Sequence, residues 1–224
     1  MSGRRTRLAI AANLALAALC IGAWLRMALG FDGTGRLVSM SWGSMKYFTI
    51  LSNLFCALTA LIAAGLEWGI LRGRRENLPL WAAALKMAGT AAVGLTFLVV
   101  ITFLAPLYGY PDMYRGGNFL LHGLNPVLAA LILILLEAWP SLGWRVRLTA
   151  LLPPLMYSVY YYGVILTRGV MGNDFYSFAR WGVSGAILIT VIIAAAIIGF
   201  CWAVEALRGR VRRKAEAAAE GGRA

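Results

Sequence analysis

The chain has 224 residues, of which 61% are hydrophobic and only 13% are charged. Roughly 45–50% of the residues in a soluble domain are apolar and about 25% are charged, so this composition excludes an ordinary soluble protein. It also excludes a disordered or collagen-like chain. The excess of apolar side chains must face lipid, and the length then limits how many membrane spans the chain can hold.

Stretches without charge locate the expected helices, because a span needs about 20 mostly apolar residues. Six such stretches occur, and they predict helices near residues 8–29, 46–66, 82–107, 118–138, 148–167 and 181–204. The first segment has an alternative interpretation as a secretory signal, since arginines precede its apolar run. Its 18 uncharged residues exceed the usual signal core of about 7–15 residues, which favours a retained span. We therefore predict an all-α, polytopic membrane protein whose six-helix domain covers residues 8–204.

The basic residues predict the orientation of these helices. Of the 21 Lys and Arg residues, fourteen lie on the side of the two termini and five on the opposite side. Short cytoplasmic loops are the richer in Lys and Arg, so both termini are predicted to be cytoplasmic. Residues 1–7 then form a cytoplasmic N-terminus and 205–224 a basic, partly disordered tail. The Arg- and Ala-rich composition suggests a bacterial cytoplasmic membrane.

Topology accounts for most of the net charge of +12, so nucleic acid is not an expected partner. The basic tail either anchors the orientation or also contacts anionic membrane lipids. Lys86 is expected near a cytoplasmic helix end, where its amine reaches water.

The sequence offers little for a cofactor. Cys20, Cys56 and Cys201 are odd in number and fall in separate predicted spans, which does not fit a disulfide framework. A single histidine and scattered carboxylates do not supply the three or four ligands of a metal site. No glycine-rich phosphate loop follows a strand. We therefore predict neither a metal nor a diffusible cofactor.

Polar residues inside the spans are costly in hydrocarbon and by default mark function. Thr49 lies three residues past Lys46, and His122 lies four residues past Asn118. At 1.5 Å per residue, both sit about 5–6 Å inside their helices, on the side opposite the termini. The other half of the bundle is expected to be nearly featureless. Further polar candidates on the same side are Arg26, Asn53, Asn125, Tyr157, Tyr160, Tyr161 and Arg168.

Thr49 and His122 together have the chemistry of an activated nucleophile, in which a neutral imidazole removes the hydroxyl proton and later returns it to the leaving group. A third group should orient the imidazole, and an oxyanion hole is also required. For the orienting group the sequence leaves open Asn53, Asn125, a tyrosine, Asp32, Asp112 and Asp174. For the oxyanion hole it leaves open Asn53, Arg26 and a tyrosine.

The same residues can also be interpreted as purely structural. Threonine in a membrane helix commonly bonds a carbonyl of its own helix, and a lone histidine or asparagine often joins two helices. The tyrosines fit an interfacial aromatic belt as well as they fit a substrate-lining role. Arg26 and Arg168 fit charges that snorkel to the membrane surface.

Three segments resemble the androgen-induced (AIG/ADTRP-like) family of six-helix membrane proteins. "GSMKYFTILSN" at 43–53 is similar to the family's Lys-aromatic-x-Thr element, and "NFLLHGLNPVLAALILILLE" at 118–137 is similar to its Leu-x-His-Gly element. "YSVYYYGVILTRGVMGNDFYSF" at 157–178 resembles its Tyr-rich fifth helix and the following loop. Relatives often have a Tyr-Pro-aromatic run where this chain reads "NDFYSF", a departure that concerns substrate recognition.

Animal members of this family are threonine hydrolases of fatty acid esters of hydroxy fatty acids. The resemblance therefore implies six helices with cytoplasmic termini, Thr49 as the nucleophile, His122 as its base, and a lipid or amphipathic ester as the substrate. The alternative is a non-enzymatic binder or transporter of an amphipathic small molecule or lipid that uses the same pocket. A third option is a purely structural membrane protein.

Overall fold

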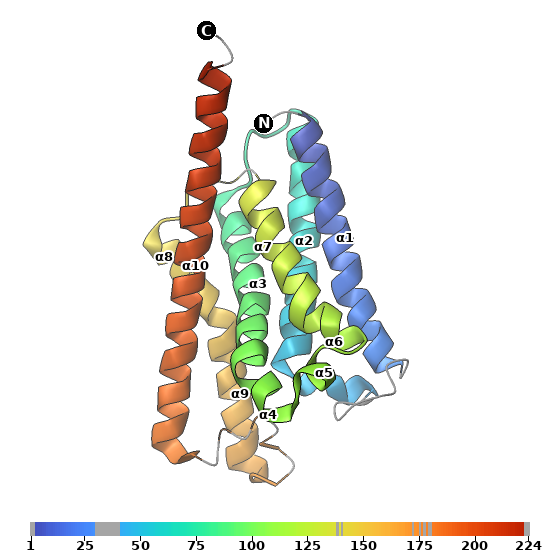
Figure 1. Ribbon diagram of the computed structural model, residues 1–224, viewed down its shortest axis with the longest axis vertical. Coiled ribbons are helices and arrows are strands. Elements are labelled where there is room, and N and C mark those ends of the chain that lie inside the picture. The colour runs from blue at the N-terminus through green and yellow to red at the C-terminus, as the bar shows by residue number, and fades with distance from the viewer. Residues whose placement is uncertain are drawn as a thin grey trace.

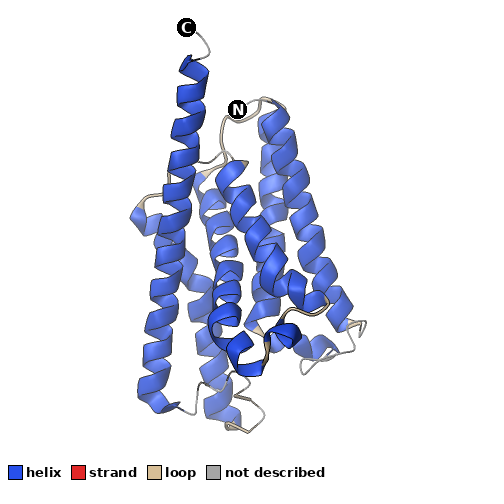
Figure 2. Cartoon of the chain, in the orientation of Figure 1, coloured by secondary structure: helices blue, strands red, loops and turns tan. Residues whose placement is uncertain are grey.

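The computed structural model describes residues 3–29, 41–137, 139, 141–171, 173–174, 176, 178 and 181–221. Within these ranges every regular element is a helix (Figure 2). Five helical segments are long and apolar enough to cross a membrane: Gly3–Ala28, Phe48–Leu71, Leu80–Tyr108, Gly117–Leu135 and Gly182–Lys214. The prediction of an all-helical membrane protein is confirmed at this level.

The helices lie side by side along the long axis of the molecule, and α1 begins at the same end at which α10 finishes (Figure 1). We call this the terminal end and the other the opposite end. The long helices are α1 (Gly3–Ala28), α2 (Phe48–Leu71), α3 (Leu80–Val99), α7 (Asn125–Leu135), α9 (Leu152–Arg168) and α10 (Gly182–Gly221). The shorter elements are η1 (Ser41–Lys46), η2 (Val100–Leu104), α4 (Ala105–Tyr108), α5 (Tyr110–Met113), α6 (Gly117–Phe119), η3 (Leu120–Leu124), α8 (Trp144–Arg147) and η4 (Leu148–Leu151).

Helix α3 occupies the centre of the bundle, where it contacts α2, α7, α9 and α10, while α1 packs against α2 and α7. Its buried surface is rich in small residues, among them Ala83, Ala88, Ala91 and Ala92. Small side chains let neighbouring helices approach closely, which is the main source of packing energy between helices in lipid.

Two of the predicted helices differ in length from the helices that the structure contains. Residues 148–167 form η4 and α9, and α9 with its 17 residues is shorter than each of the five candidate spans. Helix α10 begins near the expected position but continues for 40 residues, through most of the segment expected to be a tail. Residues 222–224 lie outside the described part of the chain.

The terminal half of the bundle is not featureless, contrary to the sequence-based expectation, and Lys86 does not reach water. Lys86 is completely buried, and its Nζ lies 3.5 Å from Glu137 Oε1 and 2.6 Å from Asn13 Oδ1. Asn13 Nδ2 in turn donates to Glu67 Oε2 at 3.2 Å and to Glu137 Oε1 at 3.0 Å. We call these four residues the ionic cluster. The expectation was wrong because charges were treated as the limits of spans, whereas here they pair inside the bundle.

Helices α2 and α3 approach closely at Gly89. A Cβ atom there would lie 2.4 Å from Thr59 Oγ1 and 3.3 Å from the Cα of Cys56. Because overpacking a dense core typically costs about 1–3 kcal/mol, we expect Gly89→Ala to lower the free energy of unfolding by that amount. Unfolding of the purified protein in detergent measures this, with Gly65→Ala as the control, since no atom lies within 4 Å of a Cβ at that position. Equal losses in both variants would contradict the close approach.

Candidate functional site

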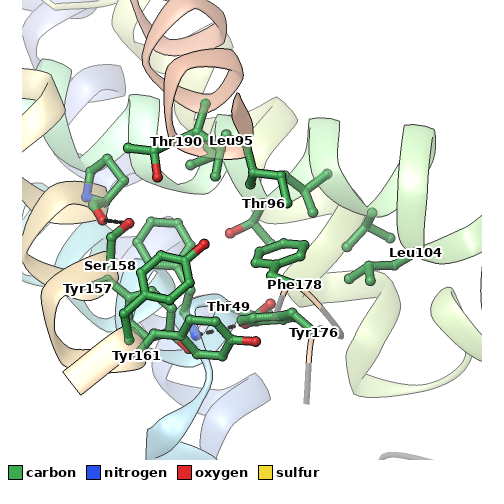
Figure 3. Close-up of a pocket in the computed structure, with 17 residues that line it drawn as sticks. Thr49, Leu95, Thr96, Leu104, Tyr157, Ser158, Tyr161, Tyr176, Phe178 and Thr190 are labelled. Carbon is green, nitrogen blue, oxygen red and sulfur yellow. Dashed lines mark hydrogen bonds between the residues drawn. The ribbon is translucent and has the colours of Figure 1, made fainter. Parts of the chain in front are cut away.

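A small cavity lies at the opposite end of the bundle, between α2, α3, α9 and α10 (Figure 3). Its volume is ≈ 60 Å³. Thr49, Tyr157 and Tyr161, three of the residues singled out from the sequence, line it. Tyr162, from the same helix as Tyr157 and Tyr161, also lines it, and sequence reasoning did not select the other polar groups of its wall, which are Thr96, Ser158, Tyr176 and Thr190. The rings of Tyr157, Tyr161, Tyr176 and Phe178 gather on the side of the cavity where Thr49 lies.

Thr49 is the second residue of α2, and two tyrosines hold this helix start in place. The Tyr176 hydroxyl accepts a hydrogen bond from the Phe48 N–H at 3.1 Å, satisfying one of the unpaired donors of the first helical turn. The Tyr157 hydroxyl donates to the carbonyl oxygen of Lys46 at 2.8 Å. Burial raises the pKa of Tyr176 to about 12, so this phenol stays neutral at physiological pH.

His122 is buried in η3, a π-helical turn at the start of the fourth apolar segment. The turn has a local cause, since Pro126 has no N–H to donate to the carbonyl of residue 122 and a regular α-helical bond is impossible there. Such π-turns within α-helices occur frequently at functional sites.

The imidazole of His122 has a defined tautomer. Its Nδ1 lies 2.8 Å from the carbonyl oxygen of Met113 in α5. A carbonyl only accepts, so Nδ1 carries the hydrogen and Nε2 of the neutral ring has the free lone pair. This is the form that a general base requires. The orienting group is thus a backbone carbonyl, which none of the six sequence candidates supplied and for which side-chain patterns carry no signal.

Asn53 joins the segment of Thr49 to the segment of His122. Its Nδ2 donates to the carbonyl oxygen of Thr49 at 2.8 Å and to that of Leu121 at 3.2 Å. Asn125 Nδ2 donates to Asn53 Oδ1 at 2.9 Å, and both asparagines are fully buried. Because one nitrogen reaches both carbonyls, the backbones at residues 49 and 121 are adjacent. The His122 side chain does not line the cavity, however, and no hydrogen bond between Thr49 and His122 occurs in the structure.

The remaining predicted residues lie apart from this arrangement. Arg26 and Arg168 are exposed where α1 and α9 finish at the opposite end of the bundle, and neither lines the cavity. Tyr160 lines a different groove. Asp174 Oδ1 accepts hydrogen bonds from the Tyr161 hydroxyl and from the Phe178 N–H, so it orders the loop beside the cavity. Asp32 lies outside the described residues.

A second, larger groove of ≈ 940 Å³ adjoins the cavity along α2, α3, η4 and α9. Almost all of its wall is apolar, and it shares Phe48 and Tyr157 with the cavity. Trp81 and Met156 on its walls are 56% and 71% exposed, so the groove is open to the surroundings of the bundle. Among the described residues, no three His, Cys, Asp or Glu side chains come together as metal ligands would.

No protein family, characterised protein or solved structure matches this chain on comparison.

Proposed function

We propose that the protein is an intramembrane threonine-dependent hydrolase of lipid esters, related to the androgen-induced family, with six spans and both termini in the cytoplasm. Thr49 is its nucleophile and His122 its general base. The observation that carries this proposal is the arrangement around Asn53, which joins the backbone at Thr49 to the backbone beside His122. The bond from His122 Nδ1 to the Met113 carbonyl leaves Nε2 as the nitrogen that can accept a proton.

In the proposed reaction, His122 Nε2 takes the proton of the Thr49 hydroxyl while Oγ1 attacks the ester carbonyl. The tetrahedral intermediate then expels the alcohol, which receives that proton, and leaves an acyl group on Thr49. Water attacks the acyl group in the same way, with His122 again as the base, and releases the acid. The two side chains must come within hydrogen-bonding distance for the first step. Such catalytic bonds often tighten only when substrate is bound.

The shape of the site supports a substrate with a long apolar part. Ligand sites for small molecules are about 300–1,000 Å³, so the cavity beside Thr49 is too small to enclose a lipid. The adjoining groove, at ≈ 940 Å³, is large enough for such a ligand, and it meets the cavity at Phe48 and Tyr157. An acyl chain in the groove would bring its ester group to the start of α2, where Thr49 lies.

Covalent labelling by a fluorophosphonate probe tests this function. We expect the purified protein in detergent to be labelled, Thr49→Ala to remain unlabelled, and Thr49→Ser to be labelled because it keeps the hydroxyl. Thr190→Ala is the matched control, since Thr190 lines the same cavity without a proposed catalytic role. Thr49 is not the nucleophile if the wild type is never labelled, or if Thr49→Ala is labelled to the same extent as Thr190→Ala.

The alternative function, a binder or transporter of an amphipathic molecule, is favoured by one observation. Ionisable residues buried between membrane helices commonly lie on ion or substrate pathways, and the ionic cluster is such a group. A transporter would bind a lipid probe in the groove without any covalent adduct. Saturable binding that is equal in the wild type and in Thr49→Ala, with no labelling of either, would support this function instead.

A further inference from the structure

The ionic cluster in the terminal half of the bundle contains more negative than positive groups. Asn13 on α1, Glu67 on α2, Lys86 on α3 and Glu137 just beyond α7 are each at most 1% exposed. Lys86 is the only cationic side chain among the buried residues that the structure describes. With both carboxyl groups ionised, the cluster would have a net charge of −1 in a setting where an uncompensated charge is very costly.

The geometry distinguishes the two carboxyl groups. Glu137 is the ion-pair partner of Lys86 and also accepts a bond from Asn13. Glu67 has no cation in contact, and its Oε2 accepts from Asn13. In the described part of the chain, Oε1 of Glu67 and Oε2 of Glu137 are both buried without a hydrogen-bond partner, so the contact with Lys86 is what separates the two carboxyl groups. The charged groups that act on Glu67 are Glu137, which opposes its ionisation, and Lys86, which is already paired.

From this arrangement we propose that the ionic cluster is a membrane-embedded proton-binding site that holds one proton, on Oε1 of Glu67. In this state the cluster consists of one ion pair, Lys86 with Glu137, and one neutral carboxylic acid, and its net charge is zero. Release of the proton to water leaves the Glu67 carboxylate and a net charge of −1. Glu67 lies four residues before the end of α2, about 6 Å from the terminal end by the helix rise, so the path to water is short.

Other charged and titratable groups lie around the ionic cluster, but none of them takes the place of Lys86 as the cation that offsets its carboxylates. On α1, Arg5 Nε donates to the carbonyl oxygen of Leu136. On α10, Arg208 donates to the carbonyl oxygen of Trp139, and Glu205 accepts from the N–H of Leu142 at 3.2 Å. Both arginines are partly exposed, so water shields their charges more than that of Lys86. The thiols of Cys20 and Cys56 are buried on the neighbouring faces of α1 and α2.

Infrared spectroscopy of the full-length protein in lipid nanodiscs counts protonated carboxyl groups through their C=O band, which shifts in D₂O. At neutral pH we expect one such group in the wild type and none in Glu67→Gln or Glu137→Gln, because Lys86 then pairs with the remaining carboxylate. Lys86→Met should contain two, since both carboxyls lose their cation. The exposed Glu76 provides the control, and Glu76→Gln should leave the band unchanged.

The stability of the protein supplies a second measurement if Lys86→Met does not fold. A proton bound by the folded state stabilises it, so the wild-type Tm should fall as rising pH removes the infrared band. The Tm of Glu67→Gln should stay constant over the same interval. The proposal is overturned if the wild type has no protonated carboxyl at neutral pH, or if the band persists in Glu67→Gln. It is also overturned if replacing Na⁺ by choline, rather than changing pH, alters the Tm of the wild type alone, because the cluster would then hold a metal cation.

Discussion

Replacing Asn13 by leucine should destabilise the protein by about 3–5 kcal/mol, because it removes several buried hydrogen bonds and one to a charged group is worth about 1.5–3 kcal/mol. The amide of Asn13 touches every other member of the ionic cluster, since its oxygen accepts from Lys86 and its nitrogen donates to both carboxyl groups. Leucine has a similar volume, so little of the loss comes from a cavity. Three hydrogen bonds to charged or acidic groups disappear, and the groups left without them are buried.

Denaturant or thermal unfolding in detergent measures this loss, followed by the helical circular dichroism signal. Asn77→Leu is the matched control because Asn77 is exposed in the connection between α2 and α3. Surface substitutions of that kind usually change the stability by no more than about 0.5 kcal/mol. An Asn13→Leu variant as stable as the control would show that the cluster is hydrated in the membrane rather than dry.

The arrangement of the spans was predictable because the signal for a membrane helix is local. A run of about 20 apolar residues can span the bilayer wherever it occurs in the chain, so the gaps between charges located the five candidate spans. They did not locate the end of α10, which continues to Gly221. The same counting predicted that Lys86 lies at the edge of a span and reaches water, and that prediction was wrong because Lys86 is buried. Whether a charge ends a helix or pairs inside the bundle depends on Glu137 and Asn13, which are 51 and 73 residues away in sequence.

The candidate site was predictable only in part, for a similar reason. The depth of Thr49 and His122 follows from helix direction and rise, and the backbone segments that carry them are indeed adjacent through Asn53. The carbonyl of Met113 was not predictable, since every residue has a carbonyl and only the tertiary structure selects one. Tyr176 reaches the start of α2 from a loop 128 residues away, and no periodic pattern indicates such a contact.

If His122 is the base, its loss should slow the reaction without unfolding the protein. We expect His122→Phe to lower the rate of fluorophosphonate labelling at Thr49 by about 10²–10⁴-fold, the usual contribution of a general base. The wild-type rate should also fall at acidic pH, where a protonated imidazole no longer accepts a proton, and the rate of the variant should lack this fall.

Met113→Leu separates the role of the backbone from that of the side chain. The imidazole bonds only the carbonyl oxygen of Met113, and leucine retains that carbonyl with a side chain of similar size. We therefore expect Met113→Leu to label at close to the wild-type rate and with the wild-type pH profile. If His122→Phe also labels at the wild-type rate, the histidine is a packing residue and another group activates Thr49. If both variants lose labelling to the same extent, the effect is a disturbed η3 turn rather than a missing base, which unfolding measurements on the two variants would then reveal.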